Sequence, residues 1–316
     1  MKEIGGYIEL EYYNGNLYHE NAIALNCGRT ALEYLLRARS IQRIYMPYFC
    51  CDSVAQPCRK CLVDIKYYHV DEQFIPILPE TLPKDTWLYF VNYYGQFDND
   101  KLTAYKLRFP NIIVDNAQAY FQMPLVGVDT LYTCRKFFGV ADGAFLYTDA
   151  KLDITEKDES FERMHFLLGR FERTASEFYS EYLSNNKTFA NEPIKRMSKL
   201  TKNLLRGIDY EFVKKRRKQN FEYLHERLGG LNNLQLCIPE GAFMYPLYIK
   251  TSAEIRKGLQ DKKIYIPTLW PDVLKLCNAS DIEYDMAKNI LPLPIDQRYI
   301  EGDMEYIVTE MLKCLN

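Results

Sequence analysis

The 316-residue sequence contains no long hydrophobic run, and no segment approaches the roughly 18 consecutive apolar residues that a membrane-spanning helix requires. It also has little imbalance of charge, with 40 basic and 42 acidic residues and a formal net charge of −2. A nearly neutral chain has no electrostatic reason to bind nucleic acid or an anionic membrane. We therefore expect neither of them as a partner.

The chain has few histidines and an odd number of cysteines, and both counts argue against sites that depend on these residues: metal centres and a disulfide framework. The four histidines are scattered, and none completes a set of metal ligands. The nine cysteines occur in a long chain whose first 15 residues are acidic and rich in tyrosine, without the basic and apolar regions of a signal peptide. Reduced thiols in a cytoplasmic protein fit this pattern better than a disulfide framework.

Four of the cysteines gather within residues 50–61 and invite comparison with a zinc site. In the same stretch, however, small and apolar side chains recur at helical spacing. These are Cys51, Val54, Ala55, Cys58 and Leu62. The spacing favours a buried helix face, so we expect the cysteines to pack in the core and expect no metal site.

What the sequence does contain is a regular alternation of strand and helix patterns over its first 150 residues. Hydrophobic residues make up 47% of the chain and charged residues 26%, which is typical of a globular protein with an ample core. Strands are expected at 42–49, 62–71, 85–95, 110–116, 130–136 and 143–149, and helices at 30–40, 52–61 and 101–109. This β-α-β order predicts an α/β fold with a mainly parallel sheet between helices. Ligands of such sheets bind beyond the carboxyl ends of the strands.

The second half has a different character, because long charged helical patterns replace the short strands. Helices are expected over 154–184 and 194–228, then a strand at 242–250, a helix at 252–262 and a strand at 263–270. The basic run 214–218 ("KKRRK") is interleaved with apolar residues, and we interpret it as a solvated helix face rather than a nucleic-acid contact. The change of pattern predicts a second, smaller domain.

Two stretches at strand ends carry groups suited to a ligand. In "NCGRTALEYLL", Gly28 and Thr30 open a helix after an extended segment, and the free N–H groups of a helix start suit a phosphate. An ordinary helix cap would look the same. In "FVNYYGQFD", the polar ends of Asn92, Tyr94 and Gln96 follow an apolar strand and could converge on a ligand, although a simple turn would also fit.

Two charged residues in apolar surroundings carry the chemistry. Asp115 ends the expected strand in "NIIVDNAQAY", with Gln118 three residues later, and a buried carboxylate needs a cationic partner such as a protonated ring nitrogen, or else caps a helix. Lys136 ends another strand. Desolvation lowers the pKa of such a lysine and produces the neutral amine that a Schiff base requires, although a structural salt bridge is the alternative.

In this order along the chain, the motifs resemble the large domain of fold-type I pyridoxal-phosphate (PLP) enzymes. More narrowly, they resemble the DegT/DnrJ/EryC1/StrS family of sugar aminotransferases. "KFFGVADGA" gives Lys136, Ala141, Asp142, Gly143 and Ala144 at the family's offsets. The other matching segments are "IIVDNAQA", "NCGRTALE", "VNYYGQFD" and "IKRMSKL". The resemblance covers most of the chain and is best over residues 22–149.

The resemblance implies a fold-type I transferase with a PLP-binding large α/β domain at 1–205 and a small C-terminal α+β domain at 206–316. It implies a homodimeric, PLP-dependent aminotransferase that transfers an amino group from a donor to a nucleotide-linked keto sugar. Lys136 is then the catalytic residue and holds the cofactor as a Schiff base, while Asp115 pairs with the pyridine nitrogen. The other implied cofactor-binding residues are Gly28, Arg29, Thr30, Phe49, Asn92, Gln118 and Thr133.

Three positions depart from the family's pattern. Cys51 stands where an aromatic stacks on the cofactor ring, Leu131 where a serine reaches the phosphate, and Ile194 near an asparagine that reaches the neighbouring subunit. The nearby candidates for these roles are Tyr48 or Phe49, Thr133 or Thr30, and Lys195 or Arg196. The chain is also shorter than is usual for the family.

Two alternatives stay open at this stage. An amino-acid aminotransferase or a PLP-dependent lyase would keep Lys136 and Asp115 and would add an arginine that clamps a substrate carboxylate, for which Arg298 is the candidate. A non-catalytic descendant of the fold would serve as an interaction or regulatory module, and the missing stacking aromatic and the short length favour this alternative modestly.

Overall fold

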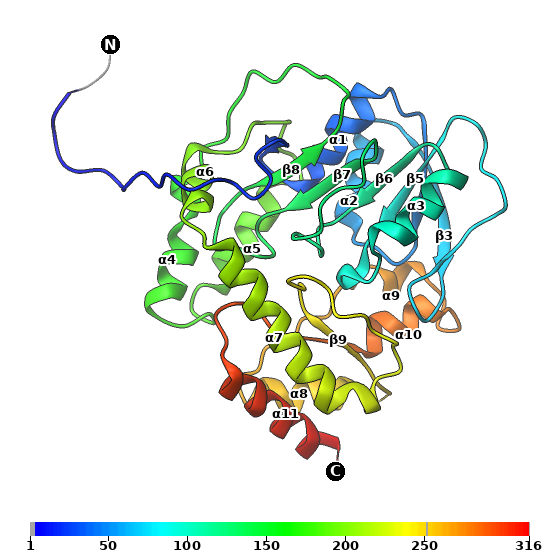
Figure 1. The fold of residues 1–316 in the computed structure, drawn as a ribbon, viewed down its shortest axis with the longest axis vertical. Helices are drawn as coiled ribbons and strands as arrows, with labels where there is room; N and C mark the ends of the chain where they lie inside the picture. Colours follow the sequence, from blue (N-terminus) through cyan, green and yellow to red (C-terminus); the bar gives the residue numbers. More distant parts are fainter. Residues whose placement is uncertain (1–3, 251, 316) are drawn as a thin grey trace.

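An eight-stranded sheet forms the centre of the fold in the computed structural model, which describes residues 4–250 and 252–315 (Figure 1). Its strands, in chain order, are β1 (Ile23–Leu25), β2 (Arg43–Pro47), β3 (Asp64–Val70), β4 (Pro76–Ile77), β5 (Thr86–Val91), β6 (Ile112–Asp115), β7 (Asp129–Thr133) and β8 (Ala144–Tyr147). In space the order is β1-β8-β7-β6-β5-β2-β3-β4. The five neighbouring strands β7, β6, β5, β2 and β3 pair in parallel. Strand β8 is antiparallel to both of its neighbours, β1 and β7, and β4 is antiparallel to β3. The expected α/β fold with a mainly parallel sheet is confirmed.

Helices connect these strands and continue into the second half of the chain. They are α1 (Gly28–Ala38), α2 (Asp52–Lys60), α3 (Asn99–Arg108), α4 (His165–Glu172), α5 (Tyr179–Thr188), α6 (Lys199–Arg206), α7 (Tyr210–Leu228), α8 (Ser252–Asp261), α9 (Val273–Leu276), α10 (Ile282–Asn289) and α11 (Glu301–Leu315). Every residue of β6, and all but one of β5, is buried. Strands covered on both faces are apolar along their whole length, which is why these segments lack the alternation of a half-exposed strand.

The register of the parallel strands brings their carboxyl ends to one edge of the sheet. Val91 at the end of β5 pairs with Asp115 at the end of β6, and Asp115 pairs with Leu131 in β7. Strand β7 ends at Thr133, three residues before Lys136. The acid and the lysine therefore emerge at neighbouring strand ends, as parallel pairing requires.

Helix α1 begins directly after β1 and presents its first turn to the same edge. Its N-cap residue Cys27 is extended, and the Cys27 N–H donates to the Thr30 hydroxyl at 3.3 Å. Leu32, Leu35 and Leu36 recur at the helical period and are buried against the sheet. The apolar face anchors the helix and so fixes where its free N–H groups point.

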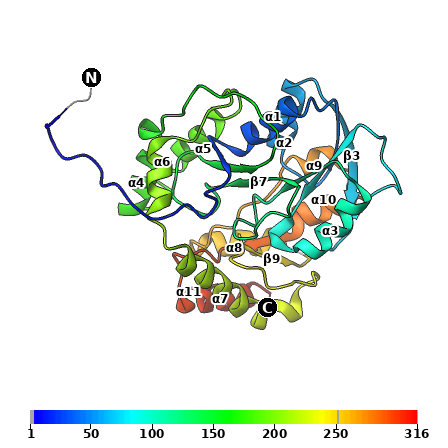
Figure 2. The same ribbon diagram turned by 45° about the horizontal axis from the view of Figure 1, so that its top comes forward.

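The C-terminal half adds a two-stranded antiparallel sheet of β9 (Tyr245–Tyr248) and β10 (Ile290–Leu293). In both views α7, α8, α11 and β9 lie together beside the large sheet (Figures 1 and 2). They enclose a second core that includes Phe221, Leu224, Leu247, Leu291, Met304 and Met311. This second sheet lies within the range 206–316 expected for a small domain, and the boundary near residue 205 stays a prediction.

The strand expected at 263–270 is wrong, because β10 is the partner of β9 instead. Ile264 and Ile266 are buried in the second core. The alternating pattern therefore predicted correctly that these side chains are buried, but it wrongly predicted that the segment pairs as a strand. The true partner strand was hidden by Pro292, which cannot donate to a ladder. Pro292 lies opposite Pro246, so the two residues that lack an N–H face each other.

The long helix expected over 154–184 is also wrong, because the structure breaks it into α4 and α5 with an irregular segment before them. The chain turns back between the two helices, and the ring of Phe178 packs against Gly169. A Cβ at Gly169 would lie 2.4 Å from that ring, so the close approach requires glycine. A charged amphipathic pattern does not reveal such a contact.

Two burial expectations need correction as well. Cys58 is fully buried on α2 as expected, but Leu62 is 90% exposed, because α2 ends at Lys60 and Leu62 adopts a positive φ of 58° beyond it. In the basic run on α7, Arg217 is buried rather than solvated. It donates hydrogen bonds to the backbone carbonyls of Ala242, Phe243 and Phe137 and therefore binds buried backbone rather than solvent.

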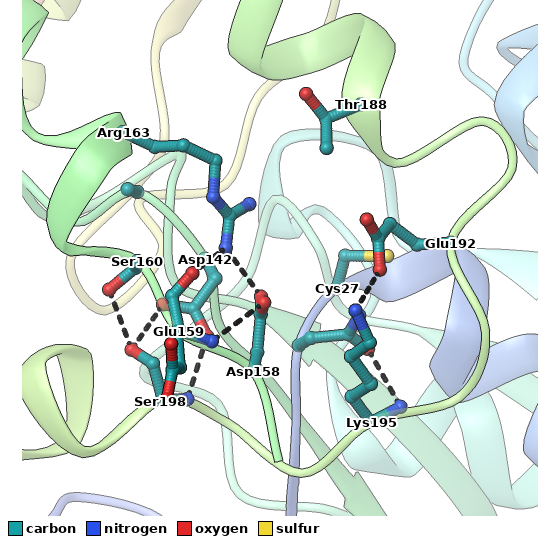
Figure 3. Close-up of polar contacts among 12 residues, drawn as sticks. Cys27, Asp142, Asp158, Glu159, Ser160, Arg163, Thr188, Glu192, Lys195 and Ser198 are labelled. Atoms are coloured by element: carbon teal, nitrogen blue, oxygen red, sulfur yellow. Dashed lines mark hydrogen bonds and ion pairs between the residues drawn. The ribbon is translucent and has the colours of Figure 1, made fainter. Parts of the chain in front are cut away.

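A buried carboxylate fixes the segment that runs between the sheet edge and α6 (Figure 3). Asp142 accepts hydrogen bonds from the Ser198 N–H at 2.8 Å and the Ser198 hydroxyl at 2.7 Å, and from the Thr201 hydroxyl. The preceding residue, Met197, donates its N–H to the Ala24 carbonyl of β1 at 3.1 Å. Asp142 therefore ties the turn before β8 to the start of α6.

We expect the Asp142→Ala variant to lower the free energy of unfolding by about 3 kcal/mol, because it leaves buried donors without an acceptor. Urea denaturation followed by circular dichroism measures this. Asp149→Ala is the matched control, since Asp149 is an exposed carboxylate that pairs with Arg39 at the surface and should change stability little. Equal losses in the two variants would contradict the role given to Asp142.

Candidate active site

A cavity of about 230 Å³ lies at the strand ends, between the start of α1 and the loop that follows β7. Six of the nine predicted site residues line it: Gly28, Arg29, Asp115, Gln118, Thr133 and Lys136. These residues come from three separate segments of the chain, at the start of α1 and at the ends of β6 and β7, and the sheet brings them together.

Lys136 projects from a tight turn after β7, in which the N–H groups of Phe137 and Phe138 both donate to the Cys134 carbonyl at 2.9 Å. Its side chain is accessible because it lines the cavity, and its amine lies 5.4 Å from the centre of the Phe243 ring. Within the described part of the chain, the amine has no hydrogen-bond or ion-pair partner. Desolvation by the surrounding protein lowers the pKa of Lys136, and the charge of Asp115 opposes this by raising it.

Asp115 is held rigidly at the end of β6. Its Oδ2 accepts from the Tyr89 hydroxyl at 2.8 Å, and its Oδ1 accepts from the Ala117 N–H at 2.8 Å. Burial raises the pKa of Tyr89, and the neighbouring carboxylate raises it further, so the phenol stays a donor. Two carboxylate oxygens can accept about four hydrogen bonds, which leaves Asp115 able to accept a further donor from the cavity.

The first turn of α1 closes the other end of the cavity. Gly28 lies so near the end of β7 that a Cβ there would be 2.8 Å from the Thr133 methyl carbon. Gly28 and Arg29, in the first turn of α1, line the cavity, and the dipole at a helix start favours an anion. Arg29 donates from Nε to Gln56 at 2.9 Å, and the Nε of Arg135 is buried with no hydrogen-bond partner. This end of the cavity therefore suits a phosphate.

Gln118 lies on the cavity wall and is almost fully buried. Its Oε1 accepts from the backbone N–H of Tyr94 at 2.8 Å, in a turn where Tyr94 has a positive φ of 52°. The side-chain amide nitrogen has no hydrogen bond among the described residues, so Gln118 retains a donor for a ligand.

Three predicted residues are not brought to the cavity wall. The Thr30 hydroxyl is bound to the Asn26 side chain at 2.5 Å and to the Cys27 carbonyl at 2.9 Å, so it serves the helix cap. Phe49 is fully buried beneath the wall, in contact with Trp270. Asn92 closes a turn through hydrogen bonds to the backbone carbonyl and N–H of Phe97, each at 3.0 Å.

Trp270 and Tyr89 line the cavity and were missed by the sequence analysis. Trp270 lies 4.5 Å from the Phe49 ring, ring centre to ring centre, and supplies the aromatic wall that was expected from Phe49. It has a positive φ of 53°, which is strained for a bulky side chain. No sequence signal marks Trp270, whereas Tyr89 could have been found from its place two residues before the end of a buried strand.

Of the three residues that depart from the family's pattern, two lie at the cavity and one does not. Cys51 and Leu131 lie on the cavity wall, so the ligand would touch a thiol and an isobutyl group at those positions. Ile194 is not part of the wall. Lys195, one candidate to replace it, is paired with Glu192 at 2.5 Å (Figure 3).

Comparisons with known proteins support the fold. No family model and no curated protein matches the sequence. Among solved structures, the chain resembles DesV of S. venezuelae in complex with a ketimine intermediate (TM-score 0.67, 18% identity, covering 92% of this chain and 84% of that one). It also resembles the sugar aminotransferase CalS13 of Micromonospora echinospora (TM-score 0.64, 16% identity, covering 93% of this chain and 87% of that one). A third similar structure is a DegT DnrJ EryC1 StrS aminotransferase of Brucella abortus (TM-score 0.66, 14% identity, covering 92% of this chain and 85% of that one). The chain thus has the fold of the fold-type I aminotransferases, and the expected resemblance is confirmed at the level of the fold.

We expect acetylation of Lys136 in the cofactor-free protein to rise with pH around a midpoint below the ordinary lysine value of 10.5. The neutral amine is the reactive form, and desolvation favours it. The Asp115→Asn variant should move the midpoint lower still, because the carboxylate charge raises the pKa of Lys136. Pulsed acetic anhydride labelling with peptide mass spectrometry measures both, with the urea-unfolded chain as reference. A midpoint that rises in the Asp115→Asn variant would sink this account.

Proposed function

We propose that the protein is a PLP-dependent aminotransferase that uses Lys136 and accepts a keto sugar linked to a nucleotide. One observation carries the proposal: a desolvated amine without a bonded partner shares a cavity with a fixed carboxylate and the N-terminus of a helix. An aldehyde-bearing, phosphorylated pyridine needs these three groups. The residues present therefore fit the cofactor.

When bound, pyridoxal phosphate supplies an aldehyde for the lysine and a ring that takes up the electrons left when a substrate carbon loses its proton. In this chain, the amine of Lys136 is the base that holds and returns that proton. Asp115 would bind the protonated ring nitrogen, and the Tyr89 hydroxyl and Ala117 N–H keep its carboxylate in place. The start of α1, Arg29 and Thr133 would bind the phosphate.

The arrangement favours a keto sugar over a 2-oxo acid as the amino acceptor. Arg298, the candidate clamp for a substrate carboxylate, already forms two hydrogen bonds of 2.7 Å with Asp296. A substrate carboxylate would have to displace this partner.

We expect the purified protein to bind added PLP with a new absorption band in the visible range, and Lys136→Ala to lose the band completely. Borohydride reduction followed by peptide mass spectrometry should place the pyridoxyl group on Lys136. With the aminated cofactor, nucleotide keto sugars should restore the PLP spectrum, and 2-oxo acids other than the one derived from the amino donor should not. A pyridoxyl group on another lysine, or a protein that takes up no PLP, would overturn the proposal.

We also propose that the enzyme is a homodimer of the cytoplasm. No helix among the described residues is apolar and long enough to cross a membrane. Large apolar side chains are exposed on and beside α4 and α5: Phe161, Leu168, Phe171, Tyr179 and Leu183. An exposed group of this kind, next to Tyr182 on the cavity wall, supports an interface at the site.

Phe171 is 91% exposed and tests the dimer. Phe171→Glu should weaken self-association about tenfold or more, because a charge would be buried in an apolar interface. Analytical ultracentrifugation over a dilution series measures this. Leu107→Glu, on the remote helix α3 and 82% exposed, is the control and should leave self-association unchanged. A wild-type protein that is monomeric at every concentration would refute the dimer.

A further inference from the structure

Arg135 lines the cavity that suits the cofactor, in the turn between β7 and Lys136. It lies near the start of α1, because the charge of Arg29 in that first turn lowers the pKa of Arg135. The Nε of Arg135 is buried, and it has no acceptor among the described residues. A cationic donor is therefore available at the end of the cavity that suits a phosphate.

No carboxylate balances the charge of Arg135. Its guanidinium group donates to the neutral side chain of Asn186, and it forms no ion pair within residues 4–250 and 252–315. Arg163 is the contrasting case. Both guanidinium groups lie near the ring of Phe189, at 4.9 and 5.2 Å from its centre, but Arg163 pairs with Asp158 at 2.6 Å (Figure 3). Of the two neighbours, only Arg135 lacks an anion.

The charges on the cavity wall are unbalanced in the same direction. Besides Arg135, the charged residues of the wall are the cations Arg29 and Lys136 and the single carboxylate Asp115. Desolvation lowers the pKa of Arg135, and the like charges of Arg29 and Arg163 lower it further. A bound phosphate would stabilise the charged guanidinium group and supply the acceptor that its buried Nε lacks.

All the groups that the cofactor needs belong to one chain. Lys136 would meet the aldehyde, Asp115 the ring nitrogen, and Arg135 with the start of α1 the phosphate. Ile194 stands near the position where the family has an asparagine that reaches the neighbouring subunit. An isoleucine side chain has no donor to offer a phosphate, whichever subunit it reaches. A second copy is therefore not needed to supply that contact.

We propose that one chain alone holds the cofactor, and that Arg135 is the phosphate ligand that makes the site independent of a second copy. The inference rests on the proposed function for the identity of the cofactor. It adds that dimer formation does not control cofactor binding. The planar fork of a guanidinium group matches two oxygens of a phosphate, so Arg135 can both neutralise the group and orient it.

The test compares PLP with pyridoxal, which lacks only the phosphate. Each is titrated into the cofactor-free full-length protein and followed by quenching of tryptophan fluorescence, to which Trp270 on the cavity wall contributes. We expect Arg135→Gln to weaken PLP binding tenfold or more and to change pyridoxal binding less than twofold. Arg59→Gln is the matched control, because Arg59 on α2 pairs with Asp52 and lies off the wall. It should leave both affinities within twofold of the wild type.

The independence from a second copy is tested with Phe171→Glu, at a concentration where sedimentation shows only monomers. This monomer should bind PLP within twofold of the wild-type affinity. A tenfold or greater loss in the monomer would overturn the proposal of a site held by one chain. If the wild type is itself monomeric at every concentration, the dimer proposal fails, and PLP binding by that monomer supports the present inference.

Equal PLP affinities in the wild type and Arg135→Gln would overturn the role of Arg135. Parallel losses of PLP and pyridoxal would also overturn it, because the contact would then not be with the phosphate. Arg135→Lys, which keeps the charge without the planar fork, should retain part of the PLP affinity. If the wild type takes up no PLP, the proposed function fails, and calorimetric titration with inorganic phosphate decides the role of Arg135. A tenfold weaker binding in Arg135→Gln supports that role, whereas equal affinities or no binding overturn it.

Discussion

The attraction between the amine of Lys136 and the carboxylate of Asp115, inside a partly desolvated cavity, is the interaction on which the account depends. Desolvation favours the neutral amine and the carboxylate favours the charged one, so the two effects oppose each other at a single nitrogen. The net effect is a pKa for Lys136 below the ordinary lysine value, which increases the fraction of neutral amine at a given pH. The balance exists only because parallel pairing of β6 and β7 puts both residues at one sheet edge.

The loop that carries Lys136 is restrained from both halves of the chain. The carbonyl of Phe137 accepts from Arg217 at 3.2 Å and from the Gln297 side chain at 2.9 Å, and both donors belong to the C-terminal half. On the other side, Asp142 binds the start of α6. Hydrogen bonds from both sides therefore hold the loop that carries the amine.

Most of the fold could be predicted from the sequence, and six of the nine predicted site residues line the cavity, because strand ends and local motifs determine where their backbone lies. Asp115, Gln118 and Lys136 follow apolar runs that are long enough to identify as buried strands. Trp270 could not be found, since its position depends on a strained turn and on packing over Phe49. Arg217 was misread because a basic run on a helix looks the same whether one member points inward or all point outward.

The same limit applies to Thr30, Phe49 and Asn92, which were expected at the cofactor. Each is next to the cavity in sequence, but a local hydrogen bond or an aromatic neighbour turns its side chain away. Local spacing locates the backbone near a site, whereas the direction of a side chain is decided by tertiary contacts.

A crystal structure of the protein grown with PLP tests the central claim most directly. The account predicts electron density continuous from the Nζ of Lys136 into the coenzyme, with the ring nitrogen next to Asp115 and the phosphate at the start of α1. Coenzyme density joined to another residue, or a first cavity that stays empty while Lys136 remains free at saturating PLP, would contradict it.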